Sequence, residues 1–515
     1  MPPSFSRPTA VLAAGIVTVS LAVHAWHAVS TAAYVDFVTG VWLTLANDLV
    51  HGVFYRPLVG PDGYGGTRYF PLFFASIAGL MRLGLSPLAA GFLVSAVSAA
   101  LLATGIRRVL LRFGLPPAVA AAGAIFVFAP RFVQQGLLAI RSDVLAAGLV
   151  VWGVDFSLSA ADQERPDSRA LALAAACFTL AVATKVTSLY APAAVILALL
   201  WTARRGAALR LGWMVTVGVF AMVAIVAAAS GGRAIESWRA SGLAGAGVLE
   251  WIREIPFAFE TQVVGPSRVF TAVLLAASAA WLVMQHTGGP RILIVLFPVT
   301  IVATTVVLSS PGTSYTNQLL DAFAVSLLVI AWLVARYRAL RPLAIAALLA
   351  LSLVAARQTL RPVTTQDFRQ HTRQRAVERV ALVREMAAAS GPVLSEAPEV
   401  LVLGGSSPYL LDPFMLRVLA IRRPELLHQL YRDLDMRRFP HVILMLDPDG
   451  RHGRGWYANV DFGQPIMSRI RENYEFSHVK AGLRIYRPKA VVPPPPTQQQ
   501  PVAGSPAVAG FWSLR

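Results

Sequence analysis

Apolar runs of about 15–20 residues recur along most of this chain, and each is long enough to be a candidate for a helix that crosses a bilayer. Of the 515 residues, 56% are hydrophobic and 14% are charged, whereas a soluble protein of this size needs more polar surface to cover its core. The pattern therefore predicts a mainly α-helical, polytopic membrane protein. About eleven spanning helices are expected, near residues 9–29, 87–106, 117–131, 143–159, 169–184, 188–203, 211–229, 268–285, 291–308, 318–335 and 342–357.

The arginines predict how these helices are threaded, because the cytoplasmic loops of membrane proteins carry an excess of basic residues. With the N-terminus inside, the short loops hold Arg107, Arg108 and Arg112; Arg165 and Arg169; Arg204, Arg205 and Arg210; Arg291; and Arg336, Arg338 and Arg341. The long loops 30–86 and 230–267 and the chain after residue 357 then lie outside. This threading predicts a multi-pass protein of the cytoplasmic (inner) membrane.

The apolar segment 70–83 is expected to be an interfacial or re-entrant helix, since a span there would invert every later loop. The first apolar run lacks a convincing cleavage site and is expected to be an anchor rather than a signal peptide. The formal net charge is +18, but the arginines end apolar runs instead of forming one basic face. Membrane lipids, and not nucleic acid, are therefore the expected partners.

The composition changes after residue 357, so the transmembrane domain is assigned to residues 1–357. An arginine-rich amphipathic helix is expected at 366–389, with helical patterns between the short strand-like runs that follow it. Those runs are 392–394, 400–403, 441–446 and 483–486. Residues 358–490 are therefore predicted to form a small α/β extracytoplasmic domain, and the Pro- and Gln-rich tail 491–515 is expected to be disordered.

Five charged residues are predicted to meet on the outer side. Asp36 follows the first apolar run, Arg68 ends the first loop, Arg141 and Asp143 separate two apolar runs, and Lys185 follows another. Charges beside a membrane bundle are costly and indicate a functional site. The cations suit a lipid-linked phosphate, and a carboxylate can deprotonate an incoming hydroxyl.

Each residue also has a purely structural interpretation. Asp36 fits the N-cap of a helix beginning at residue 37 or 38, and Asp143 fits a cap or an ion pair with Arg141. Lys185 and Arg68 could simply reach the headgroups. These alternatives stay open at the level of sequence.

Weaker signals complete the candidate site. Tyr64 and Tyr69 of the first loop and Asn317 of a later external segment are candidate substrate contacts, although Asn317 also fits an ordinary helix start. His24, His27 and His51 lack the spacing of metal ligands. No metal ligand and no cofactor is assigned, and a divalent metal requirement is left open.

In these residues the chain resembles the GT-C superfamily of polytopic glycosyltransferases, particularly the branch of aminoarabinose transferases and protein O-mannosyltransferases. The resemblance covers most of the membrane region. It rests on Asp36, Tyr69-Phe-Pro-Leu72, Ile140-Arg-Ser-Asp-Val-Leu145, Lys185 and Thr316-Asn-Gln-Leu-Leu-Asp321, and in the tail on Val393-Leu-Ser-Glu396 followed by Leu411-Asp-Pro-Phe414.

The resemblance implies an inverting sugar transfer from a polyprenyl-phosphate-linked donor, with Asp36 in the position of the catalytic base. The first loop departs from the family in lacking the Asp-Glu pair of the mannosyltransferases, and the aromatic-Pro-Leu motif lacks the Glu-Lys of the aminoarabinose enzymes. These departures leave the sugar and the acceptor, whether lipid, glycan or protein, unassigned.

The leading hypothesis is a membrane glycosyltransferase at the outer face of the cytoplasmic membrane. Asp36 and Asp143 are its candidate catalytic residues, and Lys185, Arg68 and Arg141 are its candidate ligands for the donor phosphate. A transporter or lipid flippase is the first rival, although no internal repeat of the kind common in such proteins is evident. A non-catalytic membrane scaffold is the second.

Overall fold

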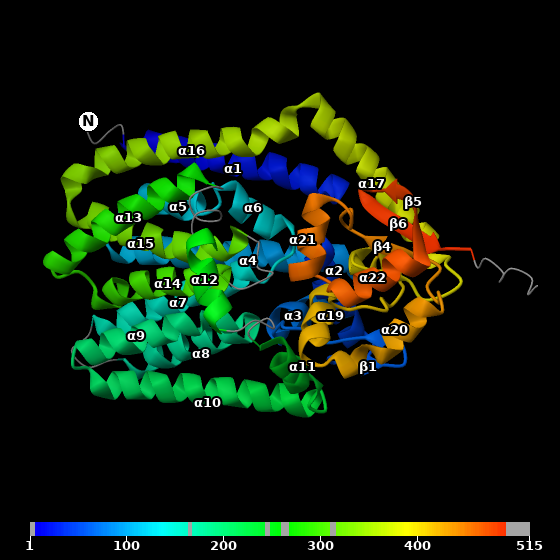
Figure 1. Cartoon of the computed structure of the whole chain (residues 1–515). Helices are drawn as coiled ribbons and strands as arrows, with labels where there is room; N and C mark the ends of the chain where they lie inside the picture. Colours follow the sequence, from blue (N-terminus) through cyan, green and yellow to red (C-terminus); the bar gives the residue numbers. More distant parts are fainter. Residues whose placement is uncertain (1–5, 163–166, 243–247, 259–266, 310–315, 491–515) are drawn as a thin grey trace, which may run out of the picture.

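The computed structural model describes residues 6–162, 167–242, 248–258, 267–309 and 316–490. Long helices lie side by side in one bundle, and an α/β region covers one end of it (Figure 1). The predicted tail 491–515 lies outside the described residues. The helices of the bundle are α1 (Ser6–Thr31), α4 (Pro87–Arg112), α5 (Pro117–Phe126), α6 (Arg131–Leu138), α7 (Asp143–Ala161), α8 (Ser168–Thr184), α9 (Tyr190–Trp201), α10 (Arg205–Ala229), α13 (Arg268–His286), α14 (Arg291–Leu308), α15 (Leu320–Arg336) and α16 (Arg341–Thr364).

The predicted helical membrane bundle is confirmed, but the number of eleven spans is not. Each predicted range falls on a helix, yet only eight helices of the described residues are long and apolar enough to cross a membrane, or nine if α5 and α6 count as one. Helices α8 and α9 are shorter apolar helices. Length therefore separates these two from the long spans.

The range predicted as one helix at 117–131 is broken in the structure. Helix α5 ends at Phe126, and α6 begins at Arg131 after a bend of 72°. Pro130 explains the break, because a proline disfavours helical geometry in the residue before it and has no N–H to donate. The bend matters for function because α6 forms one wall of the cavity described below.

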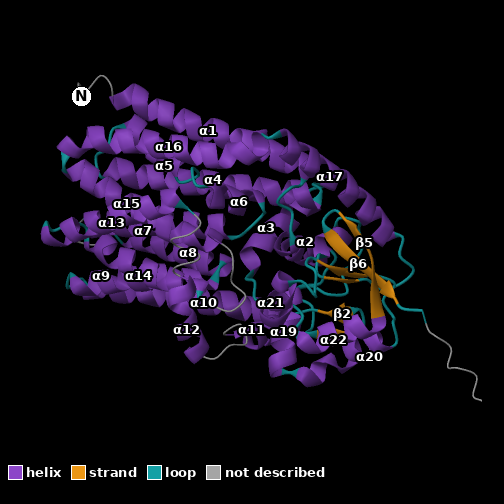
Figure 2. Ribbon diagram, turned by 45° about the horizontal axis from the view of Figure 1, so that its top comes forward, coloured by secondary structure: helices purple, strands orange, loops and turns teal. Residues whose placement is uncertain are grey.

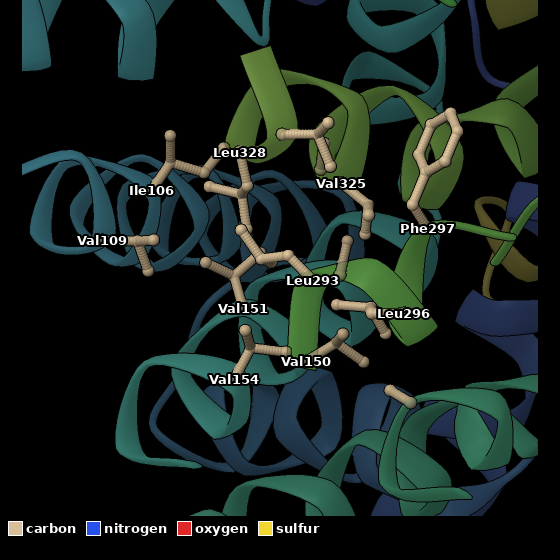
Figure 3. Close-up of a cluster of buried hydrophobic side chains, with 14 of the residues drawn as sticks. Ile106, Val109, Val150, Val151, Val154, Leu293, Leu296, Phe297, Val325 and Leu328 are labelled. Carbon is tan, nitrogen blue, oxygen red and sulfur yellow. The ribbon is translucent and has the colours of Figure 1, made fainter. Parts of the chain in front are cut away.

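The bundle is held by close van der Waals packing, as is usual for helices in lipid. A cluster of buried aliphatic and aromatic side chains joins four of its helices (Figure 3). Small residues allow the backbones to approach: a Cβ on Gly153 of α7 would lie 2.5 Å from the Phe178 ring of α8. The labelled members of the cluster are Ile106 and Val109 of α4, Val150, Val151 and Val154 of α7, Leu293, Leu296 and Phe297 of α14, and Val325 and Leu328 of α15.

Two short helices of the first loop lie at the end of the bundle that faces the α/β region (Figure 1). They are α2 (Phe37–Val50) and α3 (Pro71–Arg82), and the hairpin of β1 (Val59–Gly60) and β2 (Gly63–Tyr64) lies between them. Helix α3 has 12 residues, which is too short to span a bilayer. It coincides with the segment expected to be interfacial or re-entrant.

The predicted C-terminal α/β region is present, and its strands gather in one small area (Figure 2). Helix α17 (Gln366–Ala387) follows α16 toward a four-stranded sheet of order β3-β4-β6-β5, in which β3 and β4 are parallel and the other pairs are antiparallel. The strands are β3 (Leu394–Ser395), β4 (Val442–Leu444), β5 (Tyr474–Lys480) and β6 (Leu483–Pro488). The accompanying helices are α18 (Pro398–Val402), α19 (Pro413–Arg422), α20 (His428–Asp435), α21 (Arg451–Asn459) and α22 (Gln464–Asn473).

One strand prediction in this region is wrong, and one strand was missed. The run 400–403 lies on helix α18, which begins with Pro398 at a position where proline favours a helix start. Strand β5 was not predicted because most of its side chains are exposed at the edge of the sheet, so it has no continuous apolar run.

The α/β region packs directly on the first loop. Tyr64 pairs with it through two backbone hydrogen bonds, from its N–H to the Tyr409 carbonyl and from the Leu411 N–H to its own carbonyl. On α2, a Cβ added to Gly40 would lie 2.4 Å from the backbone nitrogen of Glu399 in α18. The position of α2 therefore depends on both parts of the molecule.

Candidate functional site

Asp36 forms the N-cap of α2. Its Oδ1 accepts a hydrogen bond from the Thr39 N–H at 3.0 Å, while its Oδ2 lies 2.5 Å from Nη2 of Arg141. The capping interpretation is therefore correct, and it coexists with an ion pair to a residue 105 positions away. About 31% of the Asp36 side chain stays exposed, so the carboxylate remains accessible to a substrate.

A strained turn between α6 and α7 positions Arg141. The preceding residue, Ile140, has φ +51°, a conformation that is rare and costly for a β-branched side chain. Ile140 is fully buried and packs against Gly91 of α4, where an added Cβ would come within 2.8 Å of its Cδ1. Thr39 holds the same turn through a hydrogen bond from its hydroxyl to the Ala139 carbonyl, 2.7 Å long.

A second ion pair lies beside the first. Nζ of Lys185 is 2.7 Å from Oδ1 of Asp143 and donates to Oε1 of Gln318 at 2.6 Å. The other Asp143 oxygen accepts a hydrogen bond from Nδ2 of Asn317 at 2.7 Å. Lys185 ends α8, Asp143 begins α7, and Asn317 precedes α15, so three separate helices meet at this pair.

Asp36, Arg141 and Asn317 line one cavity of about 240 Å³. Because Asn317 also bonds to Asp143, it connects the cavity to the second ion pair. Lys185 lies in an adjacent small cavity with Gln318. The remaining residues that line the main cavity are Ala33, Tyr34, Phe132, Gln135, Gly136 and Ala139.

Two predicted site residues lie elsewhere. Arg68 stacks on Phe414 of the α/β region, with its guanidinium carbon 3.9 Å from the ring centroid. Tyr64 is buried, and its hydroxyl donates to the Leu426 carbonyl at 2.9 Å and accepts from the Leu430 N–H at 3.1 Å. The structure therefore places both in the contact between the first loop and the α/β region, and neither lines the cavity.

Tyr69 lies between these two groups. Its ring packs on Trp42 of α2 with centroids 4.2 Å apart, and its carbonyl accepts a hydrogen bond from the Tyr55 hydroxyl at 2.9 Å. Burial raises the pKa of the Tyr69 hydroxyl, and the nearby charges of Arg68 and Arg141 lower it in part. Tyr69 is thus close to Arg141 without lining the cavity.

Sequence reasoning missed a polar chain that ends at the cavity. His24 of α1 contacts Oε1 of Gln134 through Nδ1 at 2.8 Å and the Tyr34 hydroxyl through Nε2 at 2.6 Å. The Gln134 amide nitrogen donates to the Phe128 carbonyl, so its oxygen faces His24 and Nδ1 carries the proton. In neutral His24, Nε2 then accepts from Tyr34, which fixes Tyr34 in the cavity wall. The adjacent glutamines within an apolar run, Gln134 and Gln135, were the available signal.

A group of buried acids lies in the α/β region near Arg68. Burial raises the pKa of Glu396 and of Asp412. Burial also raises the pKa of Asp461 well above the usual range, and the neighbouring carboxylates raise it further. Burial also raises the pKa of Glu399 to about 8. Among the described residues, no group of three or more His, Cys, Asp or Glu is arranged to hold a metal ion.

No protein-family model and no curated protein matches this sequence. The structure nevertheless resembles that of ArnT, an aminoarabinose transferase, from Cupriavidus metallidurans bound to undecaprenyl phosphate, with a TM-score of 0.58 and 10% identity over 92% of this chain and 97% of that chain. It also resembles the archaeal oligosaccharyltransferase AglB from Archaeoglobus fulgidus in complex with an inhibitory peptide and a dolichol-phosphate. There the TM-score is 0.51 and the identity 12%, over 92% of this chain and 74% of that chain.

Sequence identities this low establish the fold alone. The chain shares the fold of ArnT and AglB, which is the fold that the resemblance in its sequence predicted.

Proposed function

We propose that this protein is a membrane glycosyltransferase that transfers a sugar from a polyprenyl-phosphate-linked donor to a cell-envelope acceptor. The observation that carries the proposal is the Asp36–Arg141 pair, which lines a cavity at the end of a membrane bundle. It offers a carboxylate and a cation within one small volume, as a sugar phosphate and an attacking hydroxyl require. The likeness to proteins solved with undecaprenyl phosphate and dolichol-phosphate supports the same donor class.

The proposed reaction is a single displacement at the anomeric carbon. The acceptor hydroxyl attacks that carbon and gives its proton to Asp36, while the bond from the carbon to the phosphate oxygen breaks. Polyprenyl phosphate leaves with the bonding electron pair, and the anomeric configuration inverts. Negative charge grows on the departing phosphate, so Arg141 stabilises the transition state more than the ground state.

Donor binding is proposed to release Asp36 from Arg141. In the structure the two side chains neutralise one another. An incoming phosphate competes for the guanidinium, which binds phosphate and carboxylate oxygens through the same donors. The carboxylate is then available to the acceptor hydroxyl only when the donor is in place, which protects the donor from premature hydrolysis.

The other residues of the site are proposed to act in support. Asp143 orients Asn317 toward the acceptor and holds Lys185, which adds positive charge near the leaving phosphate. Arg68 and Tyr64 are proposed to fix the first loop on the α/β region instead of contacting substrate. The donor is proposed to be used at the outer face of the cytoplasmic membrane, the side that the arginine distribution assigns to the first loop.

The test is the transfer activity of purified Asp36→Asn protein against a panel of polyprenyl-phosphate sugars. Removing a general base costs about 10²–10⁴-fold in rate, so kcat is expected to fall by that factor with the variant folded normally. Asp62→Asn, an exposed position in the same loop that does not line the cavity, is the matched control and should keep full activity. Full activity in both variants would exclude Asp36 as the base. No activity of the wild-type protein with any donor would argue against the transferase itself.

A further inference from the structure

A second cavity lies at the opposite end of the same helices that form the proposed active site. Its volume is about 480 Å³. It is bordered by the end of α4 at Arg112, the end of α7 at Leu158 and Asp162, and the end of α15 at Trp332 and Arg336, with Arg338 just beyond. Nothing in the proposed reaction uses this cavity.

The spacing of the two cavities matches the thickness of a membrane. Helix α7 has 19 residues and α15 has 17, so at 1.5 Å per residue they are about 25–29 Å long. The hydrocarbon core of a bilayer is about 30 Å thick. Asp143 and Asn317 mark one end of these helices and the second cavity marks the other, so the second cavity lies at the level of the headgroups in the other leaflet.

The charges around this cavity are only partly compensated. Arg112 is held by the buried Asp155 at 3.0 Å and by Asp162 at 3.1 Å. Arg336 and Arg338 are exposed, and neither forms an ion pair with any residue in the part of the chain that the structure describes. The cavity therefore presents two guanidinium groups that have no ion-pair partner among the described residues, beside a third that is already oriented.

The apolar wall distinguishes this cavity from the ordinary arginines that end membrane helices. Such arginines reach the headgroups singly, whereas here they converge on a hollow that Trp332, Phe113 and Leu158 also line. Trp332 is held in place by close packing, because a Cβ on Gly289 would lie 3.1 Å from its Cζ2. The site therefore combines a cationic rim with a smaller apolar surface at Trp332.

We propose that this cavity binds a phosphate ester, with Arg336 and Arg338 on its oxygens and the ester carbons against Trp332. Guanidinium groups bind phosphate through paired hydrogen bonds, and basic pockets between membrane helices on this side bind anionic headgroups. An anionic phospholipid of the inner leaflet and a soluble phosphate ester share this chemistry. The proposal does not depend on the glycosyltransferase reaction.

The test measures binding of fluorescent phosphatidylglycerol to the full-length protein in phosphatidylcholine nanodiscs. The double variant Arg336→Gln/Arg338→Gln is expected to weaken binding at least tenfold. The matched control is Arg205→Gln/Arg210→Gln, which removes two exposed arginines at the same end of the bundle without touching the cavity. Equal binding by wild type and the Arg336/Arg338 variant would overturn the proposal, because these arginines would then not hold the lipid. Equal losses in both variants would also overturn it, because the attraction would then come from the basic face as a whole.

Competition identifies the source of the phosphate. Glycerol 3-phosphate is added to the complex of wild-type protein and labelled lipid, and unlabelled phosphatidylglycerol is added in a parallel sample. If both compounds displace the labelled lipid, the site recognises the phosphate ester alone. If only unlabelled phosphatidylglycerol displaces it, the site recognises the phosphate ester together with the acyl chains. If neither compound displaces the labelled lipid, the bound fluorescence is non-specific and the proposal fails.

Discussion

At the scale of single residues, the candidate site shows how one side chain can be structural and chemical together. Asp36 caps α2 through one carboxylate oxygen and pairs with Arg141 through the other. An N-cap contributes about 1 kcal/mol to a helix, and the oxygen that pairs with Arg141 is the one proposed to accept the proton once the donor phosphate holds Arg141. The two interpretations of this residue were therefore never exclusive.

Replacing Arg141 by lysine tests the role of its guanidinium. Lysine keeps the charge but loses the planar fork that binds two oxygens at once. We expect kcat/KM for the polyprenyl-phosphate donor to fall about tenfold, which corresponds to about 1.4 kcal/mol. Initial rates at varied donor concentration measure the effect. Arg131→Lys, on α6 but outside the cavity lining, should leave kcat/KM unchanged, and an unchanged kcat/KM in Arg141→Lys would remove Arg141 from the donor site.

Glu399 gives a prediction about pH. Its pKa is raised from 4.5 to about 8 by burial, so the folded state binds a proton more tightly than the unfolded state does. The contribution of Glu399 to the free energy of unfolding is therefore fully present below about pH 4.5, and it is lost as the pH rises toward and beyond 8. Glu399→Gln keeps the neutral shape at all pH values, and we expect it to raise the apparent Tm at pH 8.5 more than at pH 5.5.

The measurement for Glu399 is thermal unfolding followed by tryptophan fluorescence, with both proteins scanned at the same rate. The shift in pKa corresponds to a few kcal/mol at most, so a difference of several degrees between the two pH values is expected. Glu425→Gln, at an exposed position, is the control. A Tm difference between Glu399→Gln and wild type that does not change with pH would contradict the prediction.

At the scale of elements, the position of α2 depends on the α/β region that packs on it. Gly40 of α2 touches the backbone of α18, where a Cβ would be 2.4 Å from the Glu399 nitrogen. Arg379 of α17 donates to the carbonyls of Ala32 and Val35 at 2.8 and 2.9 Å, just before Asp36. The helix that carries Asp36 is therefore fixed from two sides by residues far along the chain.

Gly40→Ala is expected to lower stability by about 1–3 kcal/mol, because the new methyl group has no space against α18. Gly79→Ala in α3 is the control, since no atom lies within 4 Å of its Cβ position. That change should be neutral or stabilising by about 1 kcal/mol, as expected for alanine in place of a helical glycine. Thermal unfolding of both variants measures the difference, and equal stabilities would show that α2 and α18 do not pack as described.

Arg379→Gln tests whether α17 positions the catalytic segment. The variant loses the hydrogen bonds from Arg379 to the carbonyls of Ala32 and Val35, which frees the backbone that leads to Asp36. We therefore expect kcat to fall about tenfold while the KM for the donor changes little. Misplacement of a base by a fraction of an ångström is sufficient for such a loss. Arg384→Gln, an exposed arginine of the same helix, should have full activity. A fall in both variants would mean that the charge of α17 matters and not its contact with the turn.

At the scale of the whole molecule, all five charged candidates lie at one end of the bundle or in the contact between the first loop and the α/β region at that end. The second cavity lies at the other end. This polarity follows from the loops, because the first loop and the α/β region pack together at one end while arginine-rich turns occupy the other. The molecule then has two possible orientations in the membrane, with the α/β region either outside the cell or in the cytoplasm. The distribution of arginines predicts that the α/β region lies outside.

Thiol labelling tests that orientation. Cys177 is the only cysteine, so Cys177→Ala gives a cysteine-free protein into which single cysteines are introduced. Ser477→Cys on the exposed edge strand β5 should react with a membrane-impermeant maleimide in intact cells, and Arg205→Cys should react only after lysis. Labelling of Arg205→Cys in intact cells, with Ser477→Cys protected, would reverse the threading and place the proposed reaction on the cytoplasmic side.

The elements of the bundle were predictable because their signal is local. Apolar runs such as 87–106 and 291–308 carry the helix signal in their own composition, and the structure has α4 and α14 there. The break after Phe126 was missed because the next residues, Val127-Phe-Ala129, are themselves apolar, so composition alone does not reveal the bend. The helix at 398–402 was missed because the four apolar residues at 400–403 fit a strand equally well.

The sequence by itself determined the class of protein, the positions of the helices and the acid, Asp36, that begins the candidate site. These depend on hydrophobic length and on neighbours close in the chain. Only the tertiary structure decided which cations meet Asp36. Arg141 reaches it across 105 positions through the strained turn at Ile140, whereas Arg68 lies against Phe414 instead. Contacts of that kind depend on how helices pack in three dimensions, and no periodicity along the chain encodes them.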